Sequence, residues 1–169
     1  MPCRRLAEAV AEPGESMTRR ATDDAGIRFF DALVRYETDL WNAVDHDLRS
    51  AGLPGIGYVQ ALRIVAAHAG SCRVHELREG LRITGGAASK LTDRLEASGL
   101  VARTANPADR RSSFLVLTDE GAEACERAVA VVAAALTRYL ADATADTRRL
   151  ADILTELRAV LHTPETGSH

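Results

Sequence analysis

The sequence predicts a mainly α-helical fold that contains one small β-hairpin. Apolar residues recur at three- and four-residue steps over most of the chain, which is the spacing of one helix face. Near the middle, two short strand-like segments, 100–104 and 113–117, are joined by a polar turn sequence, a pattern typical of a hairpin. Glycine, proline and threonine mark the ends of these segments, so the order of the elements can be followed along the chain.

The length of 169 residues is enough for one domain with a core of its own. We expect a tail over residues 1–20, which show little apolar periodicity, and a single domain over residues 21–163. No apolar run reaches the roughly 18 residues of a membrane span. The start of the chain also lacks the apolar stretch of a secretory signal. These observations predict a cytoplasmic protein with no membrane partner.

The first predicted helix spans residues 22–51 and ends before Gly52. Its apolar residues follow helical steps and include Phe30, Leu33, Val34, Leu40, Trp41, Val44 and Leu48. A second helix is predicted over residues 56–69, and a short third helix over residues 74–81.

Two threonines mark the starts of later helices, because a threonine hydroxyl can accept a hydrogen bond from the free amides of a helix's first turn. Thr84 precedes a helix predicted over residues 87–98, and Thr118 begins a helix predicted to reach residue 141. The last helix is predicted over residues 146–161, with Leu150, Ile153, Leu154 and Leu157 on one stripe.

A helix pair followed by a β-hairpin is the layout of a winged helix-turn-helix, with its core at about residues 55–118. The long helices at about 22–51 and 118–161 carry apolar stripes that exceed what this small module can cover. A second copy of the chain would bury them. We therefore expect N- and C-terminal dimerisation helices and a homodimer.

The charge distribution favours a module that contacts nucleic acid. The whole chain has a net charge of −3, but residues 73–113 contain eight Lys or Arg against five Asp or Glu. That segment is therefore +3 and the remainder −6. A basic middle between acidic ends fits a DNA-contacting module on a scaffold that DNA does not attract, although chance clustering would give the same count.

The helix after Thr84 has two distinct faces. Ala88, Leu91 and Leu95 are spaced to face a core, whereas Lys90 and Arg94 share another face with glycine at its start. Such a face can approach the floor of a major groove while its cations reach base edges or phosphates. An ordinary solvated helix face is the alternative. The DNA-binding candidates on this helix are Thr84, Gly85, Gly86, Ala87, Ser89, Lys90 and Arg94.

The turn between the strand-like segments supplies three further DNA-binding candidates, Asp109, Arg110 and Arg111. Two adjacent arginines at a hairpin tip are too far from a hydrophobic core to pack into it. An exposed arginine suits the negative potential of a narrow minor groove of DNA. The carboxylate of Asp109 can hold a neighbouring guanidinium in place. The alternative is a solvated, charged turn.

Enzymatic chemistry finds no support in the sequence. No GxSxG motif, glycine-rich phosphate loop or metal motif is present. Cys3, Cys72 and Cys125 are too scattered for a disulfide framework or a metal site, and the five histidines form no HxxxH or HExxH pattern. We expect no metal and no cofactor. An interaction protein that does not bind DNA is an alternative of another class, but it would not need arginines on a hairpin tip.

The stretch from Val74 to Gly121 resembles the MarR family (multiple antibiotic resistance regulators). The residues that carry the resemblance are RLEASGLVAR at 94–103, NPADRR at 106–111 and LTDEG at 117–121. The resemblance implies a homodimer on a pseudopalindromic operator, with a recognition helix in each major groove and a wing in each flanking minor groove. The family's wing arginine falls on Arg110. Asn106 stands where the family commonly has Asp, which leaves the operator sequence open.

The resemblance also implies a mode of regulation. Many members respond to small phenolic or aromatic carboxylate ligands that bind between the dimerisation helices and the winged module. Candidate pocket residues here are Tyr36, Trp41, His46 and Tyr58, which would serve equally well in a core or an interface. Other members sense oxidants through a cysteine in the first helix, but none lies in residues 22–51. A ligand-released repressor is the main hypothesis, with a redox-responsive or constitutive DNA-binding regulator as the alternative.

Overall fold

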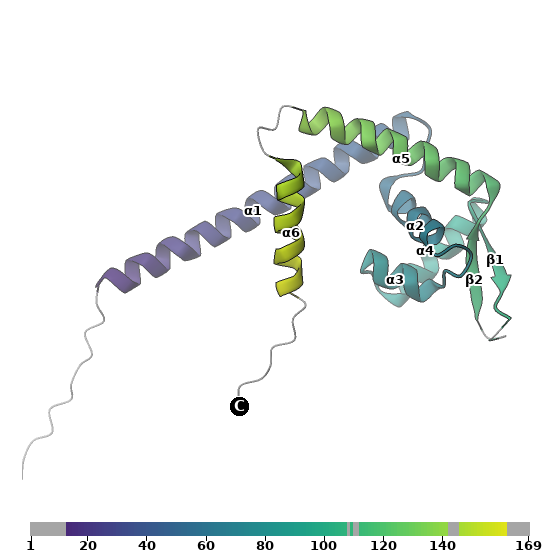
Figure 1. Ribbon diagram of the computed structural model, residues 1–169, viewed down its shortest axis with the longest axis horizontal. Coiled ribbons are helices and arrows are strands. Elements are labelled where there is room, and N and C mark those ends of the chain that lie inside the picture. Colours follow the sequence, from purple (N-terminus) through teal and green to yellow (C-terminus); the bar gives the residue numbers. More distant parts are fainter. Residues whose placement is uncertain (1–12, 108, 110–111, 142–145, 162–169) are drawn as a thin grey trace, which may run out of the picture. The chain divides into compact units, whose positions relative to one another are not determined.

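The computed structural model describes residues 13–107, 109, 112–141 and 146–161, and their side chains from residue 24 onward. Within these residues the chain forms six helices and one two-stranded antiparallel sheet (Figure 1). Their bounds are α1 (Pro13–Ser50), α2 (Ile56–Ala67), α3 (Val74–Leu81), α4 (Gly85–Ala97), β1 (Val101–Ala105), β2 (Ser113–Leu117), α5 (Asp119–Leu140) and α6 (Thr147–Val160). The predicted mainly α-helical fold with one β-hairpin is confirmed.

The chain divides into two compact units, Met1–Ala43 and Val44–His169. The described part of the first unit is helical throughout and belongs to α1. That helix begins at Pro13, inside the segment 1–20 for which the sequence predicted a tail. Proline suits the first position of a helix because the amide hydrogen that it lacks would have no partner there.

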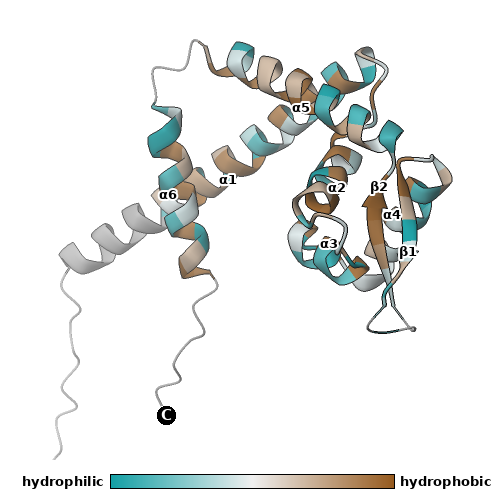
Figure 2. Ribbon diagram, turned by 45° about the vertical axis from the view of Figure 1, so that its right-hand side comes forward, coloured by the Kyte–Doolittle hydropathy of each residue, from teal (hydrophilic) through white to brown (hydrophobic). Residues whose placement is uncertain are grey.

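The core of the second unit joins α2, α3 and α4 to the hairpin and α5. It consists of Ala61, Leu62, Val65, Cys72, Leu77, Leu95, Val101, Leu115 and Cys125. In Figure 2 much of α2 and β2 has the brown of hydrophobic residues. Leu62, Leu77, Leu95 and Leu115 are fully buried, and burial of each such side chain contributes about 1.5–3 kcal/mol.

The hairpin pairs Val101 with Leu117 and Ala105 with Ser113. On its other edge β2 also meets the segment before α3, where the Leu115 amide donates a hydrogen bond of 2.7 Å to the Cys72 carbonyl. This bond attaches β2 to the segment that leads into α3.

Thr118 links the end of α4 to the start of α5. Its hydroxyl donates to the Gly99 carbonyl at 2.6 Å and accepts from the Gly121 amide at 3.0 Å. Gly121 lies so close to this junction that an added Cβ would be 1.8 Å from the Leu100 carbonyl oxygen. Only glycine therefore fits at this position.

Two acidic residues anchor the last turns of α1 within the second unit. Asp45 of α1 caps the start of α2, because its Oδ1 accepts a hydrogen bond of 2.8 Å from the Ile56 amide. The hydrogen bond from Arg49, and then that from Ile56, hold the pKa of Asp45 below its usual value. Asp47 accepts a hydrogen bond of 2.9 Å from the Tyr139 hydroxyl and pairs with Arg138, both near the end of α5.

Both terminal helices expose large apolar side chains. On α1 the exposed residues are Ile27, Phe29, Phe30, Val34, Tyr36 and Trp41, and on α6 they are Leu150, Ile153, Leu154, Leu157 and Val160. None of the α6 residues that the structure describes is buried. Across the described residues, no helix combines the length and the apolar character that crossing a membrane requires.

Candidate nucleic-acid interface

Helix α4 is the candidate recognition helix, and Thr84 begins it as predicted. The Thr84 hydroxyl accepts a hydrogen bond of 3.2 Å from the Ala87 amide. The helix starts at Gly85, two residues before the predicted start, because the capping bond already fixes the first turn. Ala88 and Leu95 are fully buried.

One buried residue of α4 was not predicted from the sequence. Thr92 is fully buried, and its hydroxyl donates a hydrogen bond of 2.9 Å to the Ala88 carbonyl. A threonine can enter the core in this way because the bond satisfies its polar group. Its position four residues after Ala88 is the signal that could have indicated burial.

The opposite face of α4 is exposed and has the predicted order of small residues followed by cations. A Cβ added at Gly85 or Gly86 would meet nothing within 4 Å, so the start of the helix has open space around it. Ser89, Lys90 and Arg94 are exposed. Within the described part of the chain, neither Lys90 nor Arg94 forms an ion pair, so both charges are directed to solvent or a partner.

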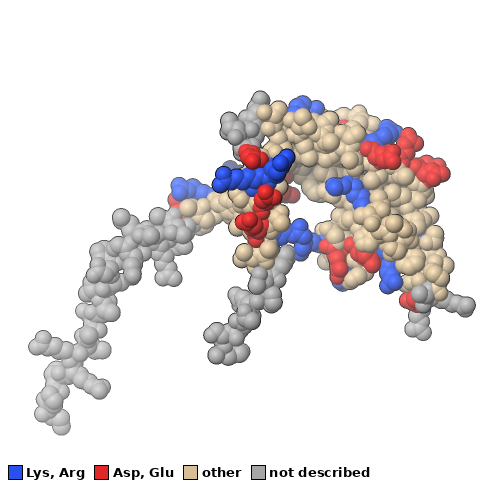
Figure 3. Space-filling view, viewed as in Figure 1, with Lys and Arg blue, Asp and Glu red and all other residues tan. Residues whose placement is uncertain are grey.

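Arg103, a cation of the basic segment, is paired with two carboxylates of α4. From β1 its Nη2 lies 2.6 Å from Asp93 Oδ1, and its Nε lies 2.9 Å from Glu96 Oε2. The hydrogen bond that Arg103 donates to Glu96 is the main cause that raises the pKa of Arg103. The one positive charge of Arg103 is shared by these two carboxylates of α4, whereas Lys90 and Arg94 are exposed cations of the same helix with no ion pair among the described residues. Figure 3 shows basic and acidic side chains interspersed on the face of the second unit that is turned to the viewer.

The base of the hairpin tip is closed by hydrogen bonds. The Asn106 side-chain amide donates to the Ser112 hydroxyl at 2.8 Å, and the Ser112 amide donates to the Asp109 carbonyl at 3.0 Å. Asn106 is 3% exposed, and Asp109 is exposed. Sequence reasoning did not assign this closing role to Asn106. The predicted wing residues Arg110 and Arg111 lie outside the described residues.

The four predicted effector residues divide between the two units. Tyr36 and Trp41 belong to the first unit and are exposed. His46 and Tyr58 belong to the second, where His46 is exposed and Tyr58 is half-buried against the core.

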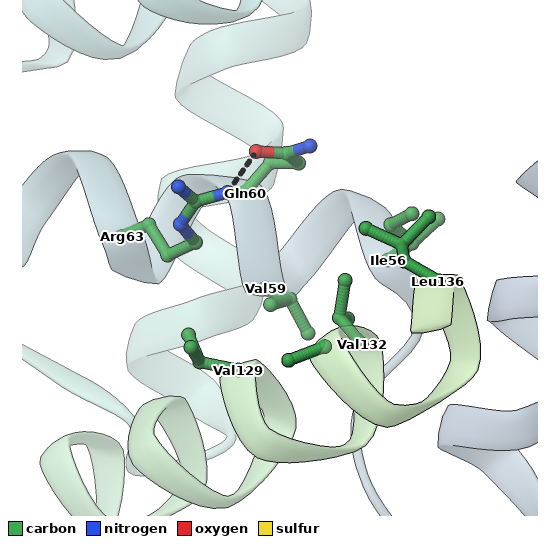
Figure 4. Close-up of a pocket in the computed structure, with 8 residues that line it drawn as sticks. Ile56, Val59, Gln60, Arg63, Val129, Val132 and Leu136 are labelled. Atoms are coloured by element: carbon green, nitrogen blue, oxygen red, sulfur yellow. Dashed lines mark hydrogen bonds between the residues drawn. The ribbon is translucent and has the colours of Figure 1, made fainter. Parts of the chain in front are cut away.

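The second unit contains a groove of about 210 Å³ that the sequence did not predict. Helix α2 contributes Ile56, Val59, Gln60 and Arg63, and helix α5 contributes Val129, Val132, Ala133 and Leu136 (Figure 4). Both sets follow helical spacing, but spacing alone does not show which two helix faces meet. The lining is aliphatic, apart from Arg63 and Gln60, which share a hydrogen bond of 3.5 Å.

Cys72 and Cys125 are buried free thiols. Burial raises the pKa of Cys72 to about 11 and also raises that of Cys125. Both are therefore protonated at neutral pH, and a protonated, buried thiol is a poor nucleophile. Among the residues that the structure describes, no cluster of His, Cys, Asp or Glu could hold a metal ion.

A capped helix with an exposed, basic face, preceded by a short helix and followed by a β-hairpin, defines a winged helix-turn-helix protein. The profile of the MarR family matches residues 51–112. Over these residues the chain is similar to the MarR family of transcription regulators.

The chain is similar to several characterised members. It is 42% identical over 71 residues to the HTH-type transcriptional repressor MdtR of Bacillus subtilis (strain 168), a match over 42% of this chain and 46% of that repressor. It thus matches less than half the length of that relative. The structure of CouR from Rhodococcus jostii RHA1 bound to p-coumaroyl-CoA is 25% identical, with a TM-score of 0.68 over 87% of this chain and 97% of that one. CouR bound to a 23-mer DNA duplex is 26% identical, with a TM-score of 0.66 over 78% of this chain and 90% of that one.

Proposed function

We propose that the protein is a homodimeric repressor that binds pseudopalindromic duplex DNA and is released from it by a small molecule. The observation that carries the DNA-binding part is the exposed face of α4, where Lys90 and Arg94 have no ion-pair partner among the described residues. MdtR is a repressor and CouR has been seen on a DNA duplex, which supports the same role for this chain. Since such a regulator acts on chromosomal DNA, we also propose a cytoplasmic location.

The proposed binding mode places α4 in the major groove. The open space around Gly85 and Gly86 lets a duplex come close to the backbone at the start of the helix. Thr84, Ala87 and Ser89 complete this small, polar end, while Lys90 and Arg94 supply positive charge to base edges or phosphates. The hairpin tip with Asp109, Arg110 and Arg111 contacts the adjacent minor groove.

The exposed apolar residues of α1 and α6 support the homodimer. A monomer rarely leaves so many large apolar side chains in water, and a contiguous exposed apolar surface is typical of an interface. Trp41 is 42% exposed and Leu154 is 45% exposed. A second copy is the proposed occupant, because a two-fold dimer also provides the pair of recognition helices that a pseudopalindrome requires.

The α2–α5 groove is the proposed effector site. Its aliphatic walls suit an apolar body, and the guanidinium of Arg63 suits an anionic group on the same molecule. CouR binds p-coumaroyl-CoA, a molecule that has both features. Tyr36, Trp41, His46 and Tyr58 stay proposed effector contacts. The buried, protonated state of Cys72 and Cys125 does not favour the redox alternative.

The decisive experiment maps the bound sites in genomic DNA and then measures binding to one such site by fluorescence anisotropy at several salt concentrations. The proposal expects a two-fold symmetric footprint with half-sites about 10 base pairs apart and an affinity that falls steeply with salt. An asymmetric footprint from a single protomer would contradict the dimeric mode. The absence of any salt-dependent binding would contradict DNA binding altogether.

A further inference from the structure

Arg82, the residue that ends α3, has an unusual backbone conformation. Its φ of 53° and ψ of 43° place it in the left-handed region. Among the described residues other than glycine, only Arg82 and Ala69 have a positive φ. This conformation is energetically unfavourable for an L-residue because its Cβ crowds the neighbouring carbonyl, whereas glycine adopts it freely.

The hydrogen bonds at the end of α3 fix this conformation. The Ile83 amide donates to the Arg78 carbonyl at 3.1 Å, and the Arg82 amide donates to the Glu79 carbonyl at 3.3 Å. This pair of bonds is the Schellman arrangement, in which the left-handed residue is usually glycine. The fold thus requires a left-handed residue here, but nothing in the helix end requires an arginine.

The side chain of Arg82 makes no contribution to the packed interior. It is exposed, and it forms no ion pair with any residue that the structure describes, in contrast to Arg78 and Arg103, which pair with carboxylates. Arg82 also stands two positions before Thr84, the residue that caps the proposed recognition helix. A free guanidinium is therefore placed at the start of α4.

We infer that Arg82 binds a DNA phosphate beside the major groove that α4 enters. This inference rests on the proposed function and adds a contact to it. A planar guanidinium binds phosphate oxygens through two parallel N–H donors, and a residue kept in a strained conformation without structural benefit points to a role in binding. Arg82 positions the start of α4 on the sugar-phosphate backbone of the DNA, while Lys90 and Arg94 point to the major groove.

The test compares Arg82→Gly with two matched variants. Glycine adopts the left-handed conformation without strain, so the Tm of Arg82→Gly should rise by about 1–3 °C. Loss of one phosphate contact should reduce the slope of log K against log salt by about 0.9 per protomer, which corresponds to a roughly five-fold weaker binding per arginine at 0.15 M salt. Arg82→Lys keeps the charge and should keep most of the slope.

Ala69→Gly is the control for the backbone alone, because Ala69 has a φ of 46° and no charge. It should raise the Tm as Arg82→Gly does and leave the salt slope unchanged. An Arg82→Gly protein with the wild-type slope would overturn the inference, and so would a lower Tm, which would show that arginine serves the fold. If the wild-type protein itself showed no salt-dependent binding, the proposed function would fail, and the inference with it.

Discussion

Arg103 of β1 donates a hydrogen bond to Asp93 of α4, with 2.6 Å between Nη2 and Oδ1. The same guanidinium also binds Glu96 one turn further along α4. The hairpin and the proposed recognition helix are thereby held together by a charged contact at their surface. The positive charge of Arg103 also offsets one of the two negative charges that Asp93 and Glu96 bring to the neighbourhood of Lys90 and Arg94.

Replacing Arg103 with Gln should weaken DNA binding more than it weakens the fold. The triad is partly exposed, so its loss should cost no more than about 1 kcal/mol of unfolding free energy. Asp93 and Glu96 would then repel the phosphates, and we expect a roughly ten-fold loss of DNA affinity, since like charges facing each other at an interface are costly. Anisotropy and thermal melting check the two effects. If the triple variant Asp93→Asn, Glu96→Gln, Arg103→Gln bound as weakly as the single variant, repulsion would not be the cause.

Lys90→Ala and Arg94→Ala should each reduce operator affinity by about 1–3 kcal/mol if the side chain reads a base edge. Such a loss would be confined to operators with the matching base. A phosphate contact would instead weaken binding to all sequences and lower the salt slope by about one. Arg127→Ala is the control for the loss of an exposed cation on another helix, since Arg127 lies on α5 and pairs with Glu123. Wild-type binding by both α4 variants would exclude this helix as the recognition element.

The double substitution Leu154→Asp, Leu157→Asp should leave the chain monomeric. Both side chains are exposed in the single chain, so the substitution removes no packing within it but places charges in the proposed interface. Analytical ultracentrifugation measures the mass, and circular dichroism shows whether the helices persist. Thr155→Asp, on the same helix, is the control and should remain dimeric. A fully dimeric double variant would argue against α6 as part of the interface.

Filling the α2–α5 groove should separate effector binding from DNA binding. Ala133 is an exposed member of the lining, so Ala133→Phe adds bulk without crowding the core. We expect operator affinity to stay within about two-fold and the proposed effector response to vanish, with p-coumaroyl-CoA, the ligand of CouR, as the probe. Calorimetric titration with and without operator measures the coupling, which for the wild type should be about 5- to 150-fold. Equal ligand affinities with and without DNA would mean that the probe binds without regulating.

The buried thiol of Cys72 predicts how stability depends on alkaline pH. Its pKa is raised from 9.0 to about 11 by burial, so the unfolded chain loses this proton at a lower pH than the folded one. Stability is therefore unaffected below about pH 9 and decreases as the pH rises toward 11, by at most about 2–3 kcal/mol. Chemical denaturation of wild type and Cys72→Ala at pH 8, 9 and 10 checks this. The variant should be less stable at pH 8 but should lose less stability on going to pH 10.

Local signals predicted much of the fold. Thr84 and Thr118 were predicted as caps because threonine is a frequent N-cap residue, and each hydroxyl indeed accepts a hydrogen bond from the amide three residues later. The order of helices and strands followed from periodicity. The pairing of Arg103 with Asp93 and Glu96 could not be predicted, because it depends on how the chain turns between α4 and β1. The groove escaped prediction for the same reason, since it requires knowing that Val59 faces Val132 across two helices distant in sequence.

Ile56 takes part in two features of the molecule at once. Its side chain lines the α2–α5 groove, and its amide binds Asp45 in one of the last turns of α1. A molecule that displaces Ile56 needs no relay of intervening residues to alter the anchor of α1. The same sharing is expected to restrict how the groove can change: a substitution at Ile56 that reshapes this end of the proposed effector site also alters the side chain next to the amide that binds Asp45.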